Sequence, residues 1–90
     1  MERISVIRIK IDEIDERLLL CLKERVETCK EIGIIKCEHG IAIRDSNREN
    51  MVYSNVMKTA CELKLDPQSV KNVYREIIAL CTSVEADTHT

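Results

Sequence analysis

The chain has 90 residues, a formal net charge of −2, 44% hydrophobic residues and 33% charged residues. This length suits one domain, 1–90, and the composition is typical of a folded protein rather than a disordered one. The slight acidic excess argues against nucleic-acid binding, and no apolar run is long enough to span a membrane. The first ten residues alternate charged and apolar types, unlike a signal peptide, so we expect a cytoplasmic protein.

The first helix is expected from about Arg3 to Lys36. Its apolar residues recur at alternating intervals of three and four, which is typical of a helix that packs along its whole length. Gly33 costs about 1 kcal/mol relative to Ala inside a helix, but we expect the helix to continue through it. The apolar seam consists of Ile4, Ile7, Ile11, Ile14, Leu18, Cys21, Ile32 and Ile35.

A loop, CEHGIAIR, follows the first helix and contains Gly40 as a helix breaker. The second helix is expected to begin near Asp45 or Ser46, and Ser46 with Glu49 has the spacing of a capping box. Its apolar stripe consists of Met51, Val52, Val56, Ala60 and Leu63.

The third helix has a sharper start, because Asp66 is a good N-cap and Pro67 suits the first helical position. Residues 86–90 are polar and are expected to form a frayed tail. The fold class is therefore all-α, with one long and two shorter helices. The buried face of the third helix should consist of Val70, Val73, Tyr74, Ile77, Ile78, Cys81 and Val84.

The length of the first helix predicts a dimer. A helix of this size is about 50 Å long at 1.5 Å per residue. A compact chain of 90 residues is only about 30 Å across. No proline bends the seam, so we expect a second copy of the chain to cover it.

One cation interrupts the seam, since Arg25 stands where the next apolar residue is due after Cys21. Lys36 lies eleven residues further on, about three turns, and so on nearly the same face. Arg44 and Arg48 stand near the start of the second helix. These cations suit a small dianion. Spacing alone leaves other interpretations open: Arg25 could extend to solvent or pair with a buried carboxylate. Lys36 and Arg8 could be solvated surface charges, and the acidic residues could be helix caps or solvated groups.

The five cysteines have no C-x-x-C spacing and their number is odd. A zinc site or a disulfide framework fits this pattern poorly. We therefore predict no metal site, and free thiols that are mostly buried.

The ordered motifs RIKIDEIDERLLLCLKER, EIGIIK and IRDSNRE resemble the all-helical chorismate mutases. The family pattern is an Arg, then I-D-x-I-D-x-x-L-L-x-L-x-x-x-R, I-G-x-x-K and D-x-x-R-E. The resemblance extends from about Ile4 to Glu85. It implies an intertwined six-helix homodimer that rearranges chorismate to prephenate without a cofactor, in the shikimate pathway of aromatic amino acid biosynthesis.

The resemblance also implies a role for each polar position. Arg8 would bind one substrate carboxylate in the other subunit's site, and Arg25 would bind the second carboxylate within its own chain. Lys36 and a protonated Glu85 would donate to the ether oxygen, although many members carry Gln at the position of Glu85. The remaining substrate contacts would come from Asp45 and Glu49 at the ring hydroxyl, from Arg48, and from Cys81, which replaces a Ser found in some members.

Helix geometry supports the shared site. Arg8 and Arg25 are seventeen residues apart, about 25 Å along one helix, so a single small ligand cannot contact both in one chain. The reaction is unimolecular, so the site has to hold the dianion in a compact shape and stabilise charge on the ether oxygen.

Three other functions remain open at this point. An isochorismate pyruvate-lyase of the same fold would use much the same cations. A non-catalytic helical dimerisation module would explain the seam but not Arg25. A nucleic-acid-binding helical domain is disfavoured by the charge.

Overall fold

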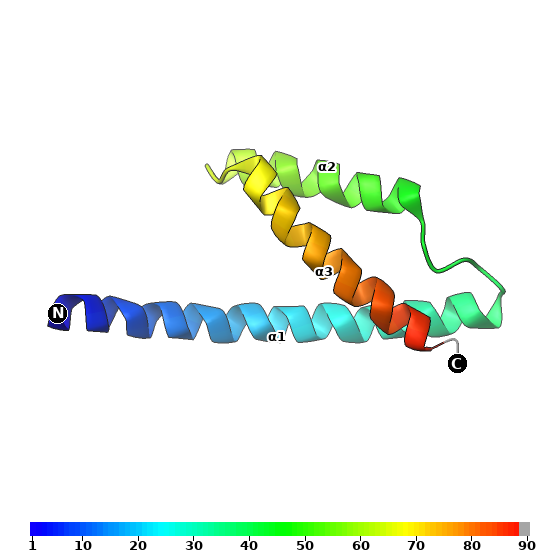
Figure 1. Ribbon diagram of the computed structural model, residues 1–90, viewed down its shortest axis with the longest axis horizontal. Helices are drawn as coiled ribbons and strands as arrows, with labels where there is room; N and C mark the ends of the chain where they lie inside the picture. The colour runs from blue at the N-terminus through cyan, green and yellow to red at the C-terminus, as the bar shows by residue number, and fades with distance from the viewer. Residues whose placement is uncertain (89–90) are drawn as a thin grey trace.

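A computed structural model describes residues 1–88, which form three helices and no strand (Figure 1). Helix α1 spans Glu2–Glu38, α2 spans Ser46–Glu62 and α3 spans Pro67–Asp87. The all-α expectation is confirmed. Helix α3 continues two residues into the segment expected to be a frayed tail, and residues 89 and 90 lie outside the described part. Within residues 1–88, no helix has the length and apolar character needed to cross a membrane.

Local sequence signals set the helix ends. Gly40 has φ +63° after α1, a left-handed conformation that costs glycine little. Asp66 caps α3 by accepting a hydrogen bond from the Ser69 backbone N–H at 2.9 Å, as expected. The Ser69 hydroxyl also donates to this carboxylate, at 2.6 Å, and the two bonds from Ser69, the hydroxyl bond first, lower the pKa of the Asp66 carboxyl. The capping box at Ser46 was wrong, because Asp45 is the N-cap of α2 and accepts from the backbone N–H of Arg48 at 3.0 Å.

Helix α3 packs against both α1 and α2, and α1 and α2 do not pack directly against each other within residues 1–88. In Figure 1, α3 crosses the C-terminal half of α1, and the N-terminal half of α1 extends beyond the other two helices. The chain measures 56 × 26 × 14 Å, with a radius of gyration of 16.4 Å. A compact chain of this length would have a radius of gyration of about 12 Å, so the single chain is elongated.

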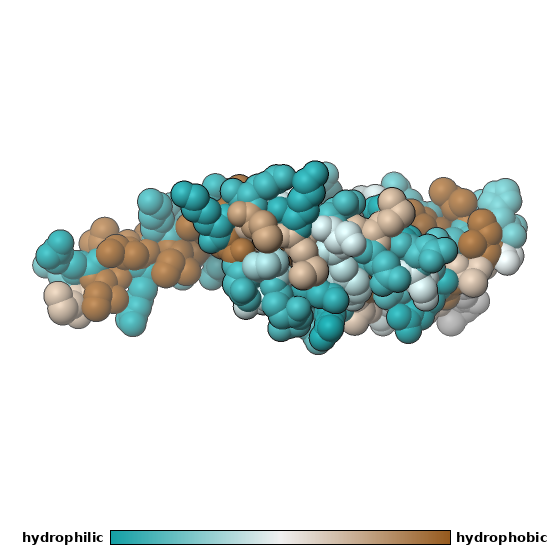
Figure 2. Space-filling model, turned by 90° about the horizontal axis from the view of Figure 1, so that it is seen from above, coloured by the Kyte–Doolittle hydropathy of each residue, from teal (hydrophilic) through white to brown (hydrophobic). Residues whose placement is uncertain are grey.

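The apolar side chains of the N-terminal half of α1 are exposed and visible at the extended end of the molecule (Figure 2). The expected α3 face is only partly confirmed, because Val73 is exposed; on α2, Met51 and Leu63 are exposed as well. The cysteines are free, but the expectation that most are buried was wrong for the single chain: three are exposed and only Cys81 is buried. The buried hydrophobic core of the described chain is small: Ala60, Ile78 and Cys81.

Gly33 lets the end of α3 approach α1 closely. A Cβ added to Gly33 would lie 2.9 Å from the Cα of Glu85 and 2.7 Å from the Thr88 Oγ1. Real Cβ atoms do not approach backbone atoms so closely, so a larger residue here would displace α3. Gly33 therefore fixes where Glu85 sits relative to α1.

Candidate active site

A pocket of about 230 Å³ lies between the C-terminal half of α1, the start of α2 and the end of α3. Its walls combine cations, carboxylates and apolar side chains, as expected for a site that orients a small polar ligand. The lining residues are Arg25, Cys29, Ile32, Lys36, Ile43, Asp45, Arg48, Glu49, Val52, Ile78, Cys81, Thr82 and Glu85.

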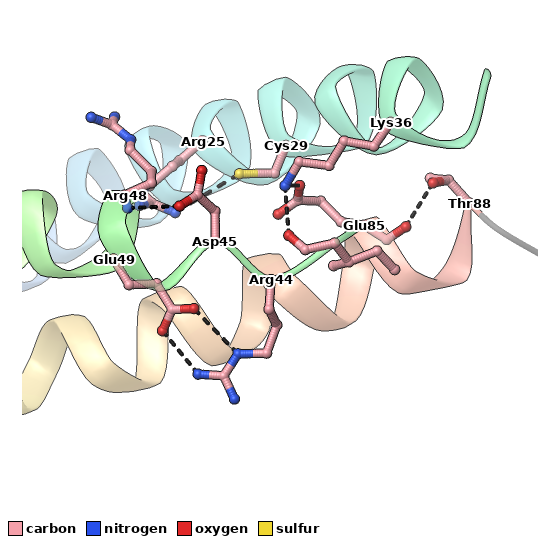
Figure 3. Close-up of polar contacts among 10 residues, drawn as sticks. Arg25, Cys29, Lys36, Arg44, Asp45, Arg48, Glu49, Glu85 and Thr88 are labelled. Carbon is pink, nitrogen blue, oxygen red and sulfur yellow. Dashed lines mark hydrogen bonds and ion pairs between the residues drawn. The ribbon is translucent and has the colours of Figure 1, made fainter. Parts of the chain in front are cut away.

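Lys36 and Glu85 form an ion pair that joins α1 to α3 in this pocket (Figure 3). The Lys36 Nζ donates to the Glu85 Oε1 at 2.9 Å and to the backbone carbonyl of Ile43 at 2.6 Å. The two side chains are only 17% and 11% exposed. Lys36 is therefore held by the loop before α2 as well as by α3, which fixes its ammonium group inside the site.

Arg25 lines the same pocket as the Lys36–Glu85 ion pair and is half-buried. Its Nη1 donates to the Cys81 Sγ at 2.8 Å. Its contact with the Cys29 Sγ, at 3.9 Å, is longer. Among residues 1–88, no carboxylate forms a salt bridge with Arg25. A half-buried cation without a carboxylate partner is a favourable place for an anionic ligand.

Cys29 and Cys81 lie together beside Arg25. Burial raises the pKa of the Cys29 thiol to about 11, and its hydrogen bond with Cys81 acts in the same direction. Cys29 is therefore a neutral thiol near pH 7, and it contributes a small, largely apolar surface to the pocket wall.

The start of α2 contributes two carboxylates. Asp45 is held by its capping bond to the Arg48 backbone N–H, and Arg48, which also lines the pocket, is exposed. Glu49 is half-buried and is bound by Arg44, whose Nε and Nη2 donate to Oε2 at 3.3 Å and Oε1 at 3.1 Å. The hydrogen bonds that Arg44 donates to Glu49, together with the negative charge of Glu49, raise the pKa of the Arg44 guanidinium.

All predicted site residues except Arg8 line this one pocket. Arg8 is exposed on the extended half of α1, about 25 Å from Arg25 by helical rise. Within residues 1–88, no group of three or more His, Cys, Asp or Glu side chains is placed to hold a metal ion.

Sequence reasoning missed several residues of the pocket wall. Cys29 lies one turn after Arg25 on the face that leads to Lys36, so the helical period contained a usable signal for it. Ile43 contributes its backbone carbonyl, for which no side-chain pattern exists. The pocket residues that sequence reasoning did not identify as part of a site are Cys29, Ile32, Ile43, Val52, Ile78 and Thr82.

The fold and the pocket together define a small all-helical protein whose pocket is lined by cations, carboxylates and apolar side chains. The sequence matches the family described as chorismate mutase type II over residues 7–86. It is 33% identical over 78 residues to a chorismate mutase of Methanocaldococcus jannaschii, covering 87% of this chain and 79% of the relative. The chain therefore belongs to the chorismate mutase type II family.

Two further relatives are larger or differ in substrate. The chain is 33% identical over 88 residues to a bifunctional chorismate mutase/prephenate dehydratase of Aquifex aeolicus, covering 94% of this chain and 24% of that protein. It is 27% identical over 75 residues to a 4-amino-4-deoxychorismate mutase of Streptomyces pristinaespiralis, covering 83% of this chain and 58% of the relative. The chain thus spans about a quarter of the length of the bifunctional relative.

Proposed function

We propose that the chain rearranges chorismate to prephenate in a homodimer whose two active sites each use residues from both chains. Family membership supports the reaction. The observation that carries the assignment to this pocket is Arg25, which is half-buried and has no salt bridge with a carboxylate within residues 1–88. Bound substrate would supply the missing carboxylate, and the planar guanidinium is suited to bind it with two parallel hydrogen bonds.

Lys36 and Glu85 are proposed to act on the ether oxygen. One C–O bond breaks as one C–C bond forms, so negative charge accumulates on this oxygen in the transition state. The Lys36 ammonium is held in place before substrate binds, at 2.9 Å from Glu85 and 2.6 Å from the Ile43 carbonyl. A fixed donor stabilises developing charge more than it stabilises the neutral ground state, and this difference lowers the barrier.

The carboxylates at the start of α2 are proposed to bind the ring hydroxyl. Glu49 would accept the hydroxyl hydrogen bond, Asp45 would stand beside it, and Arg48 would extend from the rim towards a substrate carboxylate. Cys81 has its thiol against Arg25, so its role is to line the pocket near the bound carboxylate.

The proposed homodimer is an intertwined bundle of six helices, with Arg8 completing the partner's pocket. Two observations support it: the extended half of α1 exposes apolar side chains, and Arg8 lies far from the pocket in its own chain. Packing two α1 helices antiparallel about a point near Glu16 would cover that surface. It would also bring Arg8 of one chain level with Arg25 of the other.

The test of the reaction is a direct comparison of substrates. We expect the chain to consume chorismate and release prephenate, and to act much more slowly on isochorismate. Product identification by chromatography separates prephenate from the pyruvate and salicylate that a lyase would release. Efficient cleavage of isochorismate with no prephenate from chorismate would overturn the mutase assignment in favour of the lyase.

The Glu85→Gln variant tests the second donor. Gln retains a hydrogen-bond donor at this position and carries no charge. We therefore expect Glu85→Gln to retain turnover of chorismate, whereas Glu85→Ala should lose about 10²-fold or more. The measurement is turnover at saturating chorismate for both variants and the unchanged chain at one fixed pH. Normal turnover in Glu85→Ala would remove Glu85 from the ether oxygen.

A further inference from the structure

Arg44 lies just outside the pocket and is tied to Glu49 by two hydrogen bonds. Its guanidinium meets the carboxylate side-on, with Nε near Oε2 at 3.3 Å and Nη2 near Oε1 at 3.1 Å (Figure 3). Arg44 itself does not line the substrate pocket, whereas Glu49 does. The two bonds fix the plane of the carboxylate as well as its position, which a single bond would leave free to rotate.

Glu49 needs an external partner to hold one orientation. It lies four residues after the N-cap Asp45, one position too far along for a capping box with the N-cap residue. Its side chain has several rotatable bonds and would otherwise sample several rotamers. Within residues 1–88, Arg44 is the side chain that forms a salt bridge with Glu49.

The backbone around Arg44 is itself fixed from both sides. The preceding carbonyl, on Ile43, accepts from the Lys36 Nζ at 2.6 Å. The following residue, Asp45, caps α2 at 3.0 Å. The three consecutive residues 43–45 thus contact three parts of the site. Ile43 accepts from Lys36 of α1, Arg44 donates to Glu49 of α2, and Asp45 caps the first turn of α2. Arg44 is therefore held in place at its backbone, although its side chain is 71% exposed.

We propose that Arg44 is a positioning residue, which holds the Glu49 carboxylate in the orientation that accepts a hydrogen bond from the ring hydroxyl of the substrate. This inference rests on the proposed function. Each carboxylate oxygen has a second acceptor site, so Glu49 can bind Arg44 and the hydroxyl together. The Arg44 side chain is 71% exposed, and ion pairs of such solvated side chains contribute little to folding stability, so loss of Arg44 should affect the reaction rather than the fold.

The experiment compares Arg44→Ala, Arg44→Lys and the control Arg75→Ala, an exposed arginine that lines an outer groove together with Arg44 and Glu49. For Arg44→Ala we expect kcat/KM on chorismate to fall about 10- to 100-fold, the loss typical of a small misplacement. Arg44→Lys should recover only part of this loss, because an ammonium group cannot form the two-pronged contact. Arg75→Ala should match the unchanged chain.

A second substrate separates positioning from a general structural role. On a chorismate analogue that lacks the ring hydroxyl, Arg44→Ala and the unchanged chain should have the same kcat/KM, because Glu49 then has no group to bind. An equal loss on both substrates, or no loss on chorismate, would overturn the role of Arg44 while leaving the mutase assignment intact. Failure of the unchanged chain to rearrange chorismate would instead overturn the proposed function, and this inference with it.

Discussion

Replacing Lys36 by methionine is expected to lower turnover by a factor on the order of 10²–10³ or more, the loss typical of removing one fixed donor from a developing negative charge. Methionine retains an unbranched chain of similar length and loses the ammonium group. The matched control is Lys23→Met on the same helix, where the lysine is 72% exposed and makes only a 3.8 Å contact with Glu27. Lys23→Met should retain normal turnover.

Loss of folding must be separated from loss of chemistry in this variant. Lys36→Met removes the ammonium group from the ion pair with Glu85, whose side chain is 11% exposed. Breaking a buried pair in this way costs about 3–5 kcal/mol of unfolding free energy. The double variant Lys36→Met/Glu85→Gln also removes the charge of Glu85, so it should regain most of that stability in thermal unfolding and remain inactive. Turnover within tenfold of normal in either variant would remove Lys36 from the reaction.

Helix ends could be predicted where the decisive contact is local. The start of α3 depends on Asp66 and Ser69, three residues apart, so the sequence contains the whole interaction. The start of α2 offered two adjacent cap residues, Asp45 and Ser46, each with a suitable group three residues on. The box failed because Asp45 and not Ser46 is the N-cap, and the Glu49 carboxylate binds Arg44. Local spacing gives no information about that competition.

The site could be predicted in part for the same reason. Arg25 and Lys36 share a face of α1 because eleven residues make about three turns, and this face follows from the sequence alone. The contact between Lys36 and Glu85 joins residues forty-nine positions apart, so spacing cannot predict it. The contact depends on the close approach of α3 to α1, which is possible because Gly33 has no side chain. The family resemblance, not periodicity, placed Glu85 in the site.

The predicted apolar seam of α1 is largely exposed in the single chain. Ile7, Ile11 and Leu18 follow the predicted period but are 60%, 50% and 61% exposed. Further along α1, the half-buried apolar side chains are Leu22, Val26 and Cys29, and Gly33 is buried, so the covered stripe does not coincide with the predicted one. A period of three and four residues identifies an apolar stripe but not the surface that covers it.

The sharing of each site between two chains is the central claim, and it predicts the behaviour of Arg8→Ala and Arg25→Ala. Each variant alone should lose about 10²-fold or more in kcat/KM, because removing one partner of a buried charge pair costs about 2–5 kcal/mol. A mixed dimer of the two variants contains one site with both arginines and one with neither. Random pairing of equal amounts should therefore restore about a quarter of normal activity.

The deciding measurement is turnover of chorismate after the two variants are unfolded together and refolded, with light scattering to establish the mass of a dimer. The matched control mixes Arg8→Ala with the double variant Arg8→Ala/Arg25→Ala, in which no dimer holds an intact site. We expect activity to return in the first mixture and not in the second. A mixture that forms mixed dimers yet stays as inactive as its components, or a folded and active monomer, would contradict the shared site.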